Sequence, residues 1–211
     1  QIIIINNIMI TIIDYDMGNL GSLLNIIKHV GGKAKISSSP EEISEANKII
    51  LPGVGRMDMG IKKLKETKID KAIYHAVKSN QSKILGVCLG MHLLFEYSEE
   101  GNINGLGLLK GRVAKFSFNG NKKLKIPHMG WNKVVFSNES SFFSSLENNR
   151  YFYFVHSYHV ICQEKSNIAA TCNYGYSFAC AVESNGILGA QFHPEKSHTN
   201  GKNFYKKFID F

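Results

Sequence analysis

Short apolar runs alternate with helical patterns through the first half of the chain, and this alternation constrains the fold most. The runs cover residues 9–13, 33–37, 48–51 and 83–87, and each has the length of a buried strand. Between them, apolar residues recur at helical spacing over 20–30, 40–46 and 61–77. Strand–helix–strand repetition predicts right-handed crossovers and a central, mostly parallel sheet flanked by helices.

The second half has a different pattern. Strands joined by short turns are expected at 111–118, 131–136, 150–160, 168–174, 177–184 and 186–193, and an amphipathic helix at 201–209. These strands are expected to be antiparallel in part. At 211 residues, with no repeat and no low-complexity linker, the chain is predicted to form a single α/β domain. We place that domain at residues 9–211, and we interpret residues 1–8 as upstream residues or as an extension of the first strand.

The net charge of +8 raises the question of a nucleic-acid or membrane partner. Of the 25 basic residues only three are arginines, Arg56, Arg112 and Arg150, and the lysines are scattered. Base readout and bidentate phosphate contacts favour arginine, so we expect a lysine-rich solvated surface and no nucleic-acid partner. The opening apolar stretch is too short to span a membrane, and no signal peptide is evident. The four cysteines form no C-x-x-C pair, so neither a metal nor a cofactor is expected, and a reducing, cytoplasmic location is predicted.

Cys88 lies between Gly86 and Gly90, directly after an apolar run and before a helix-like segment. This G-x-C-x-G pattern fits a nucleophile elbow, in which glycines permit a sharp strand-to-helix turn and leave the central side chain accessible. A free thiol has a pKa of about 8.5, and a following helix N-terminus stabilises its thiolate. The same turn offers the N–H of Leu89 to a developing oxyanion. The alternative is a buried structural cysteine.

A nucleophilic thiol needs a base, and the base needs an orienting group. Among eight histidines, His193 ends an apolar strand and is followed two positions later by Glu195. Residues i and i+2 of an extended segment point to the same side, so this carboxylate and imidazole can meet. Alternatively, His193 is an ordinary histidine at the end of a strand, and Glu195 is an ordinary carboxylate on the surface.

The loop 51–55, of sequence LPGVG, follows another strand. Its glycines allow backbone N–H groups of Gly53 and Val54 to turn toward a ligand, so the loop could complete an oxyanion hole. The alternative is a simple glycine-rich turn.

Together, the motifs PGVG, GVCLGMH and GAQFHPEKS resemble the triad-type (class-I) glutamine amidotransferases. The further segments DYDMGNLGS, PHMGWN and YFVHSYH resemble, more narrowly, the glutaminase subunits of imidazole glycerol phosphate synthase. The resemblance runs from about Met9 to the C-terminus. It implies an amidotransferase fold and hydrolysis of L-glutamine, with the ammonia delivered to a (β/α)₈ cyclase partner in a heterodimer that acts in histidine biosynthesis.

The resemblance also implies roles for individual residues. Cys88 would be the nucleophile, His193 the acid and base, and Glu195 its orienting group. Leu89 and the Gly53–Val54 loop would supply oxyanion N–H groups, and in this family the loop is thought to switch when the partner is engaged. Contacts to glutamine would come from His92, Glu100, Ser157 and Tyr158.

Three positions depart from the family pattern: His92 stands where glutamine is usual, Asp16 where a small residue is usual, and Gly21 where arginine is common. Paralogous subunits supply ammonia to ATP-dependent synthetases for acetamidino modification of surface sugars, and this acceptor is the main alternative. A stand-alone cysteine hydrolase and a basic binding module are the others. The segment PHMGWN argues against the first, and the intact cysteine, histidine and glutamate argue against the second.

Overall fold

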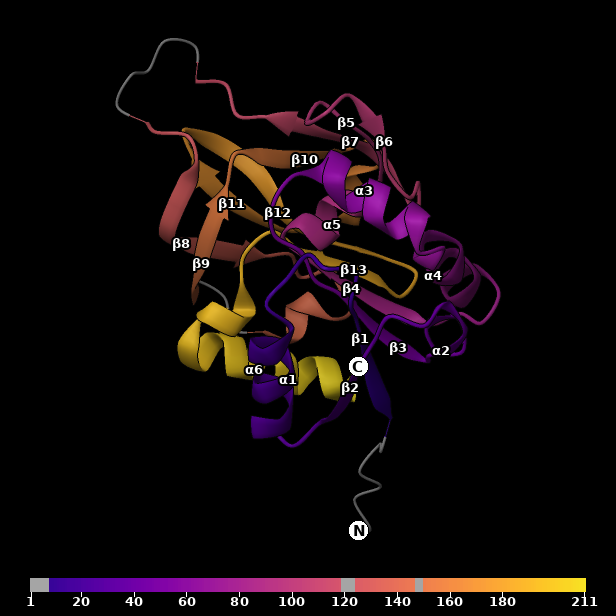
Figure 1. Ribbon diagram of the computed structural model, residues 1–211. Coiled ribbons are helices and arrows are strands. Elements are labelled where there is room, and N and C mark those ends of the chain that lie inside the picture. Colours follow the sequence, from indigo (N-terminus) through magenta and orange to yellow (C-terminus); the bar gives the residue numbers. More distant parts are fainter. Residues whose placement is uncertain (1–7, 119–123, 147–149) are drawn as a thin grey trace.

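The computed structural model describes residues 8–118, 124–146 and 150–211 (Figure 1). Its strands belong to one mixed sheet, in which neighbours run in the order β2-β1-β3-β4-β13-β12-β10-β7-β5-β6, with β11, β8 and β9 joined through β12. The predicted α/β fold with antiparallel strands in the second half is confirmed. The interpretation of residues 1–8 concerns positions that, apart from Ile8, lie outside the described residues.

The parallel part of the sheet is built from the apolar runs of the first half. All its internal pairs, β1–β2, β1–β3, β3–β4 and β4–β13, are parallel. The strands are β1 (Met9–Ile13), β2 (Lys33–Ser37), β3 (Lys48–Leu51), β4 (Lys83–Val87) and β13 (Ile187–Ala190). The first four have the predicted bounds. β3 and β4 are buried apolar runs with clear ends, whereas β2 is an edge strand in which only Ser37 is buried. The fifth comes from the end of the chain and lies beside β4.

Side chains alternate between two cores along these strands. Ile10, Ile12 and Leu85 pack in the core beneath α1 (Leu20–His29) and α6 (His198–Asp210), whereas Ile13 and Ile84 pack in the core on the other face. The second core contains the apolar sides of α3 (Met57–Glu66) and α4 (Ile69–Lys78). Figure 1 shows α1 with α6, and α3 with α4, as two separate helix groups. Helices therefore cover both faces of the parallel sheet.

The remaining strands extend the sheet in antiparallel fashion beyond β13, except that β5 and β7 pair in parallel. Their bounds are β5 (Phe95–Ser98), β6 (Ile103–Asn104), β7 (Leu109–Lys115), β8 (His128–Phe136), β9 (Arg150–His156), β10 (Tyr158–Cys162), β11 (Ile168–Tyr174) and β12 (Tyr176–Ser184). Short helices complete the chain: α2 (Pro40–Ser44), α5 (Leu89–Leu93) and the 3₁₀ turns η1 (Phe143–Ser145), η2 (Lys165–Asn167) and η3 (Pro194–Lys196).

Two predicted elements are each divided in the structure, and the strand expected over 186–193 ends at Ala190, before His193. The helix expected over 61–77 is two helices, since Lys68 adopts a left-handed conformation with φ of 60° between α3 and α4. The strand expected over 150–160 divides at Ser157, because β9 pairs with β8 whereas β10 pairs with β7 and β12. Both breaks fall inside patterns that are periodic in the sequence. Among the described residues, no helix has the length and apolar character needed to cross a membrane.

Candidate active site

Three loops meet at the carboxyl edge of the parallel sheet. β3, β4 and β13 are adjacent, and their last residues, Leu51, Val87 and Ala190, lie at nearly the same level. The chain continues from these ends into the LPGVG loop, Cys88 and His193. The Cys88 N–H donates to the carbonyl of Ala190 at 2.7 Å, which ties the first residue after β4 to β13. Segments about a hundred positions apart are therefore neighbours.

Cys88 forms a strained turn between β4 and α5. Its φ of 53° and ψ of −109° are unusual for a residue with a side chain, and its side chain is 7% exposed. A Cβ on Gly90 would lie 1.8 Å from the carbonyl oxygen of Leu51, and one on Gly86 would lie 2.6 Å from the oxygen of Gly90. Both glycines of the predicted elbow are thus required by close backbone approach. The following helix has only five residues, so its dipole is weaker than that of a long helix.

A cavity of about 300 Å³ opens at this elbow. It brings together every predicted site residue except Gly53 and Glu195, which lie behind it. The lining residues are Val54, Gly55, Cys88, Leu89, His92, Glu100, Pro127, Val155, His156, Ser157, Tyr158 and His193. Most of these residues carry polar or ionisable side chains, which suits a polar small-molecule ligand.

His193 and Glu195 make the contact predicted from their spacing. His193 Nδ1 lies 2.7 Å from Glu195 Oε1, and both side chains are buried. Glu195 is not in an extended strand, however, but in the 3₁₀ turn η3 that begins after His193. Burial lowers the pKa of His193, but the charges and hydrogen bonding of Cys88 and Glu195 outweigh it and raise the pKa to about 10. The imidazole is thus an acid held beside a sulfur.

The LPGVG loop lies against the elbow, and its Gly53 carbonyl points toward Leu89. The Leu89 N–H donates to the oxygen of Gly53 at 3.3 Å, so the N–H predicted to face an oxyanion already has a partner. Tyr15 supports this loop, since its hydroxyl donates to the carbonyl of Pro52 at 2.7 Å. A Cβ on Gly53 would lie 2.9 Å from Leu89 Cβ and in collision with the Tyr15 hydroxyl. The loop therefore needs glycine at this position.

The residues predicted to contact glutamine lie on separate elements around the cavity. Glu100 follows β5 and accepts the Met57 N–H at 2.9 Å, and partial burial raises its pKa. Ser157 and Tyr158 lie at the break between β9 and β10. His92 on α5 is buried, and its Nε2 lies 2.7 Å from Gln191 Oε1. Burial lowers the pKa of His92 to about 4, so this imidazole is neutral near pH 7.

A chain of neutral imidazoles beside the cavity was missed from the sequence. His156 Nδ1 lies 2.7 Å from the carbonyl of Tyr158 and must donate to it, so its Nε2 accepts from His128 Nδ1 at 2.9 Å. His128 Nε2 then accepts from Asn132 at 3.2 Å. A single arrangement of protons satisfies all these hydrogen bonds. Burial lowers the pKa of His128 to about 4, so this ring is neutral near pH 7. The motifs PHMGWN and FVHSYH contained these residues, but no spacing rule connects them.

Asp16, a departure from the family pattern, also has a structural setting. Its φ of 62° is a conformation that favours glycine, and its side chain forms an exposed ion pair with Lys63 at 2.9 Å. An aspartate tolerates this conformation better than most residues do. The substitution is thus accommodated outside the cavity.

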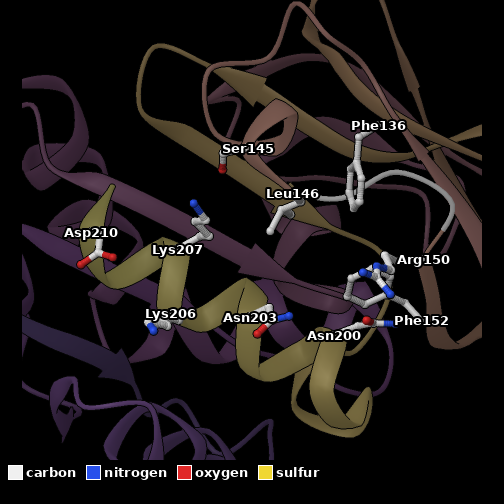
Figure 2. Close-up of a pocket in the computed structure, with 10 residues that line it drawn as sticks. All are labelled: Phe136, Ser145, Leu146, Arg150, Phe152, Asn200, Asn203, Lys206, Lys207 and Asp210. Carbon is white, nitrogen blue, oxygen red and sulfur yellow. The ribbon is translucent and has the colours of Figure 1, made fainter.

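A second cavity, of about 320 Å³, lies between β8, β9 and α6 (Figure 2). Figure 2 shows Phe136, Leu146 and Phe152 opposite polar side chains of α6, among them Asn203 and Lys206. It shares no lining residue with the Cys88 cavity and contains neither cysteine nor histidine. None of the predicted site residues lines this second cavity.

Comparisons with known proteins agree with this geometry. Residues 11–211 match the family model described as glutamine amidotransferase class-I. The chain is 48% identical over 201 residues to imidazole glycerol phosphate synthase subunit HisH 2 of Methanococcus maripaludis, covering 95% of this chain and 98% of that protein. It is 45% identical over 203 residues to subunit HisH of Bacillus subtilis, with 95% of each chain covered. A crystal structure titled as a glutamine amidotransferase superposes with a TM-score of 0.74 at 16% identity, over 95% of this chain and 99% of that one. The chain belongs to the class-I glutamine amidotransferase family, within the group of HisH subunits of imidazole glycerol phosphate synthase.

Proposed function

We propose that this chain is the glutaminase subunit of an imidazole glycerol phosphate synthase, which hydrolyses L-glutamine and passes the ammonia to a cyclase subunit. The observation that carries the proposal is the meeting of Cys88 with the His193–Glu195 pair at one cavity, on adjacent parallel strand ends. Its relatives are named as subunits of that synthase. The four free cysteines fit the reducing cytoplasm.

The reaction proceeds in two steps on Cys88. Its thiolate attacks the side-chain amide carbon of glutamine, and the imidazolium of His193 gives a proton to the departing nitrogen, which leaves as ammonia. A glutamyl thioester remains. His193, now neutral, takes a proton from water as the water attacks the thioester, and glutamate leaves with the regenerated thiolate. Glu195 holds the ring through Nδ1, so that the other nitrogen serves the reacting atoms.

The oxyanion site is in a resting arrangement in this proposal. The tetrahedral intermediate needs the N–H of Leu89, which is bonded to the oxygen of Gly53. Rotation of the Gly53–Val54 peptide would remove that oxygen and turn the N–H of Val54 inward. Val54 is 47% exposed, so its side chain offers little packing against this rotation. We assign this rotation to partner binding.

Glutamine is held by the residues that surround the cavity. The half-buried carboxylate of Glu100 receives the α-amino group, and Ser157 and Tyr158 receive the α-carboxylate. His92 lines the inner part of the cavity near Cys88. A neutral imidazole there is compatible with a neutral amide side chain, which agrees with its lowered pKa.

A surface beside the cavity fits a protein partner. Met129 and Trp131 project from β8 and are 62% and 45% exposed. The Trp131 ring stacks on His198 with centroids 5.3 Å apart, and Lys196 Nζ lies 5.8 Å from the centroid of the Tyr153 ring. Large aromatic and methionine side chains that remain exposed mark interaction surfaces. We place the cyclase, a (β/α)₈ barrel that forms imidazole glycerol phosphate and an aminoimidazole carboxamide ribotide, on this surface in a heterodimer.

The experiment mixes the purified chain with a candidate cyclase, its phosphoribosyl-formimino substrate and glutamine, and follows glutamate release. We expect a large rise on mixing and none with Cys88→Ala, because the nucleophile is absent. Cys162→Ala is the matched control, since this cysteine lies outside the cavity, and it should behave as the parent does. Equal rates with and without Cys88 would refute the proposal.

The ammonia acceptor is tested in the same assay. Imidazole glycerol phosphate formed from glutamine assigns the chain to histidine biosynthesis. Activation only by a sugar-modifying ATP-dependent synthetase would instead assign it to the acetamidino pathway and overturn the choice of partner. Full glutamine hydrolysis by the chain alone would indicate an independent hydrolase.

A further inference from the structure

Gln191 lies between Cys88 and His92, and none of the roles above uses it. It follows β13 directly and is completely buried. Its Nε2 lies 3.9 Å from Cys88 Sγ, and its Oε1 lies 2.7 Å from His92 Nε2. The first distance is long for nitrogen and oxygen but within reach of a large sulfur acceptor. One buried amide therefore bridges the sulfur and an imidazole.

The two contacts fix each other's proton positions. A thiolate can only accept hydrogen bonds, so the amide presents its N–H₂ to the sulfur and its oxygen to His92. An oxygen accepts, so His92 Nε2 must carry the ring proton. Because burial lowers the pKa of His92 to about 4, the ring carries a single proton near pH 7 and that proton is on Nε2. A reversed amide would place its oxygen against the sulfur anion, which is unfavourable.

We propose that Gln191 is a positioning residue that stabilises the Cys88 thiolate through its Nε2–H, and that His92 holds this amide in the required orientation. The inference rests on the proposed function in that it takes Cys88 as the nucleophile. His92, at a position where the family usually has glutamine, then acts on the sulfur through Gln191 in addition to lining the cavity. This explains why an imidazole is accepted there: like an amide, it offers the N–H that Gln191 Oε1 needs.

Other groups around the sulfur do not supply this effect. The carbonyl of Val155 lies 4.0 Å from Sγ and is an acceptor, so it favours the thiol over the thiolate. Burial holds the pKa of His156 well below its usual range, so that ring is neutral, and burial raises the pKa of Tyr15, so that phenol stays protonated. His193, with its raised pKa, is the cationic partner. His193, whose raised pKa depends on the charge of Cys88, and Glu100, whose pKa partial burial raises, also face the cavity, and each variant below is compared with a parent that contains both groups.

The test measures how readily the sulfur reacts in the chain alone. Iodoacetamide alkylation of Cys88 is followed peptide by peptide from pH 5 to 9, with the half-buried Cys162 as the internal reference. The variant Gln191→Met has nearly the same length but no donor. We expect the midpoint of its alkylation profile to rise by about one pH unit, which slows alkylation roughly tenfold at pH values below the parental midpoint. Cys162 should react as in the parent.

Two more variants separate this role from packing. Gln191→Glu is closely isosteric and places an oxygen against the sulfur, so it should shift the profile at least as far as Gln191→Met. His92→Gln retains a donor for Gln191 Oε1 and should keep the parental profile, whereas His92→Leu should shift it. Circular dichroism checks that each variant is folded.

The inference is overturned if Gln191→Met and the parent have superimposable profiles, or if His92→Gln and His92→Leu shift equally. Because no glutamine turnover is measured, this outcome leaves the proposed function untouched. Conversely, the alkylation profiles could shift as predicted while no glutamate is released from glutamine. That result would reject the glutaminase assignment and retain the role of Gln191.

Discussion

A fall in pH from 7 to 5 tests the burial of the imidazoles beside the active-site cavity. His92 and His128 are 5% and 3% exposed, and burial lowers the pKa of each to about 4. In the unfolded chain their pKa values return to about 6.5. Between these values the unfolded state binds more protons than the folded state, so the free energy of unfolding falls as the pH falls.

The magnitude follows from the two pKa values. A difference of about 2.5 pH units corresponds to about 3.4 kcal/mol per imidazole, which is fully expressed only below pH 4. Between pH 7 and pH 5 the expected loss is about 2 kcal/mol for each imidazole. This is a large part of the 5–15 kcal/mol by which an ordinary domain is stable. The chain should therefore be markedly less stable at pH 5.

The assay is urea unfolding of the parent and of His92→Gln at pH 7, 6 and 5. The variant lacks one buried imidazole, so its loss of stability between pH 7 and 5 should be smaller by about 2 kcal/mol, whatever its stability at pH 7. His29→Gln, which replaces an exposed imidazole on α1, is the control and should retain the parental slope. Parallel pH dependence in the parent and His92→Gln would show that His92 is protonated without cost in the folded state, against the reasoning.

Three further substitutions have definite outcomes. Gly90→Ala should abolish soluble folded protein, because its Cβ would lie 1.8 Å from Leu51 oxygen, whereas Gly21→Ala, with no atom within 4 Å, should leave the melting temperature unchanged or raise it. Lys48→Met should lower the free energy of unfolding in urea by about 1.5–3 kcal/mol, since the buried ammonium donates to two carbonyls at the end of α6. Trp131→Ala should weaken binding of the candidate cyclase in calorimetry, because the ring is 45% exposed on the proposed docking surface.

The parallel half of the fold could be predicted from the sequence because its strands are short runs between helical patterns, mostly apolar in β1, β3 and β4. Their bounds were correct for β1, β2, β3 and β4. The break at Lys68 could not be predicted, because apolar residues of α3 and α4 continue at helical spacing across it and only a left-handed φ separates the helices. Likewise, β9 and β10 form one aromatic run in the sequence, and their separation comes from the different strands with which they pair.

The contents of the site were predictable to the extent that a motif contains them. Cys88, His193 and Glu195 stand in short patterns with a chemical reason for each residue. Tyr15 and Gln191 also lie within conspicuous segments of the sequence. Their contacts, however, are with distant residues: Tyr15 bonds to a residue 37 positions away, and Gln191 contacts residues about a hundred positions away. Such contacts depend on which strands are neighbours. Here β13 adds to β4 from the far end of the chain, and no local periodicity carries that information.

Some parts of the site have the arrangement that the proposed reaction requires, and one part does not. The sulfur, the His193–Glu195 pair and the buried amide are held by strand ends and by a turn whose glycines cannot be replaced. In contrast, the Gly53 carbonyl of the LPGVG loop accepts the Leu89 N–H at 3.3 Å, and the proposed mechanism requires this peptide to rotate before that N–H can serve an oxyanion. A long hydrogen bond of this kind contributes on the order of 1 kcal/mol to stability, so contacts from a bound partner can offset its loss. In the proposed mechanism, control of the reaction therefore resides in this peptide, whereas the residues proposed as nucleophile and base are already in place.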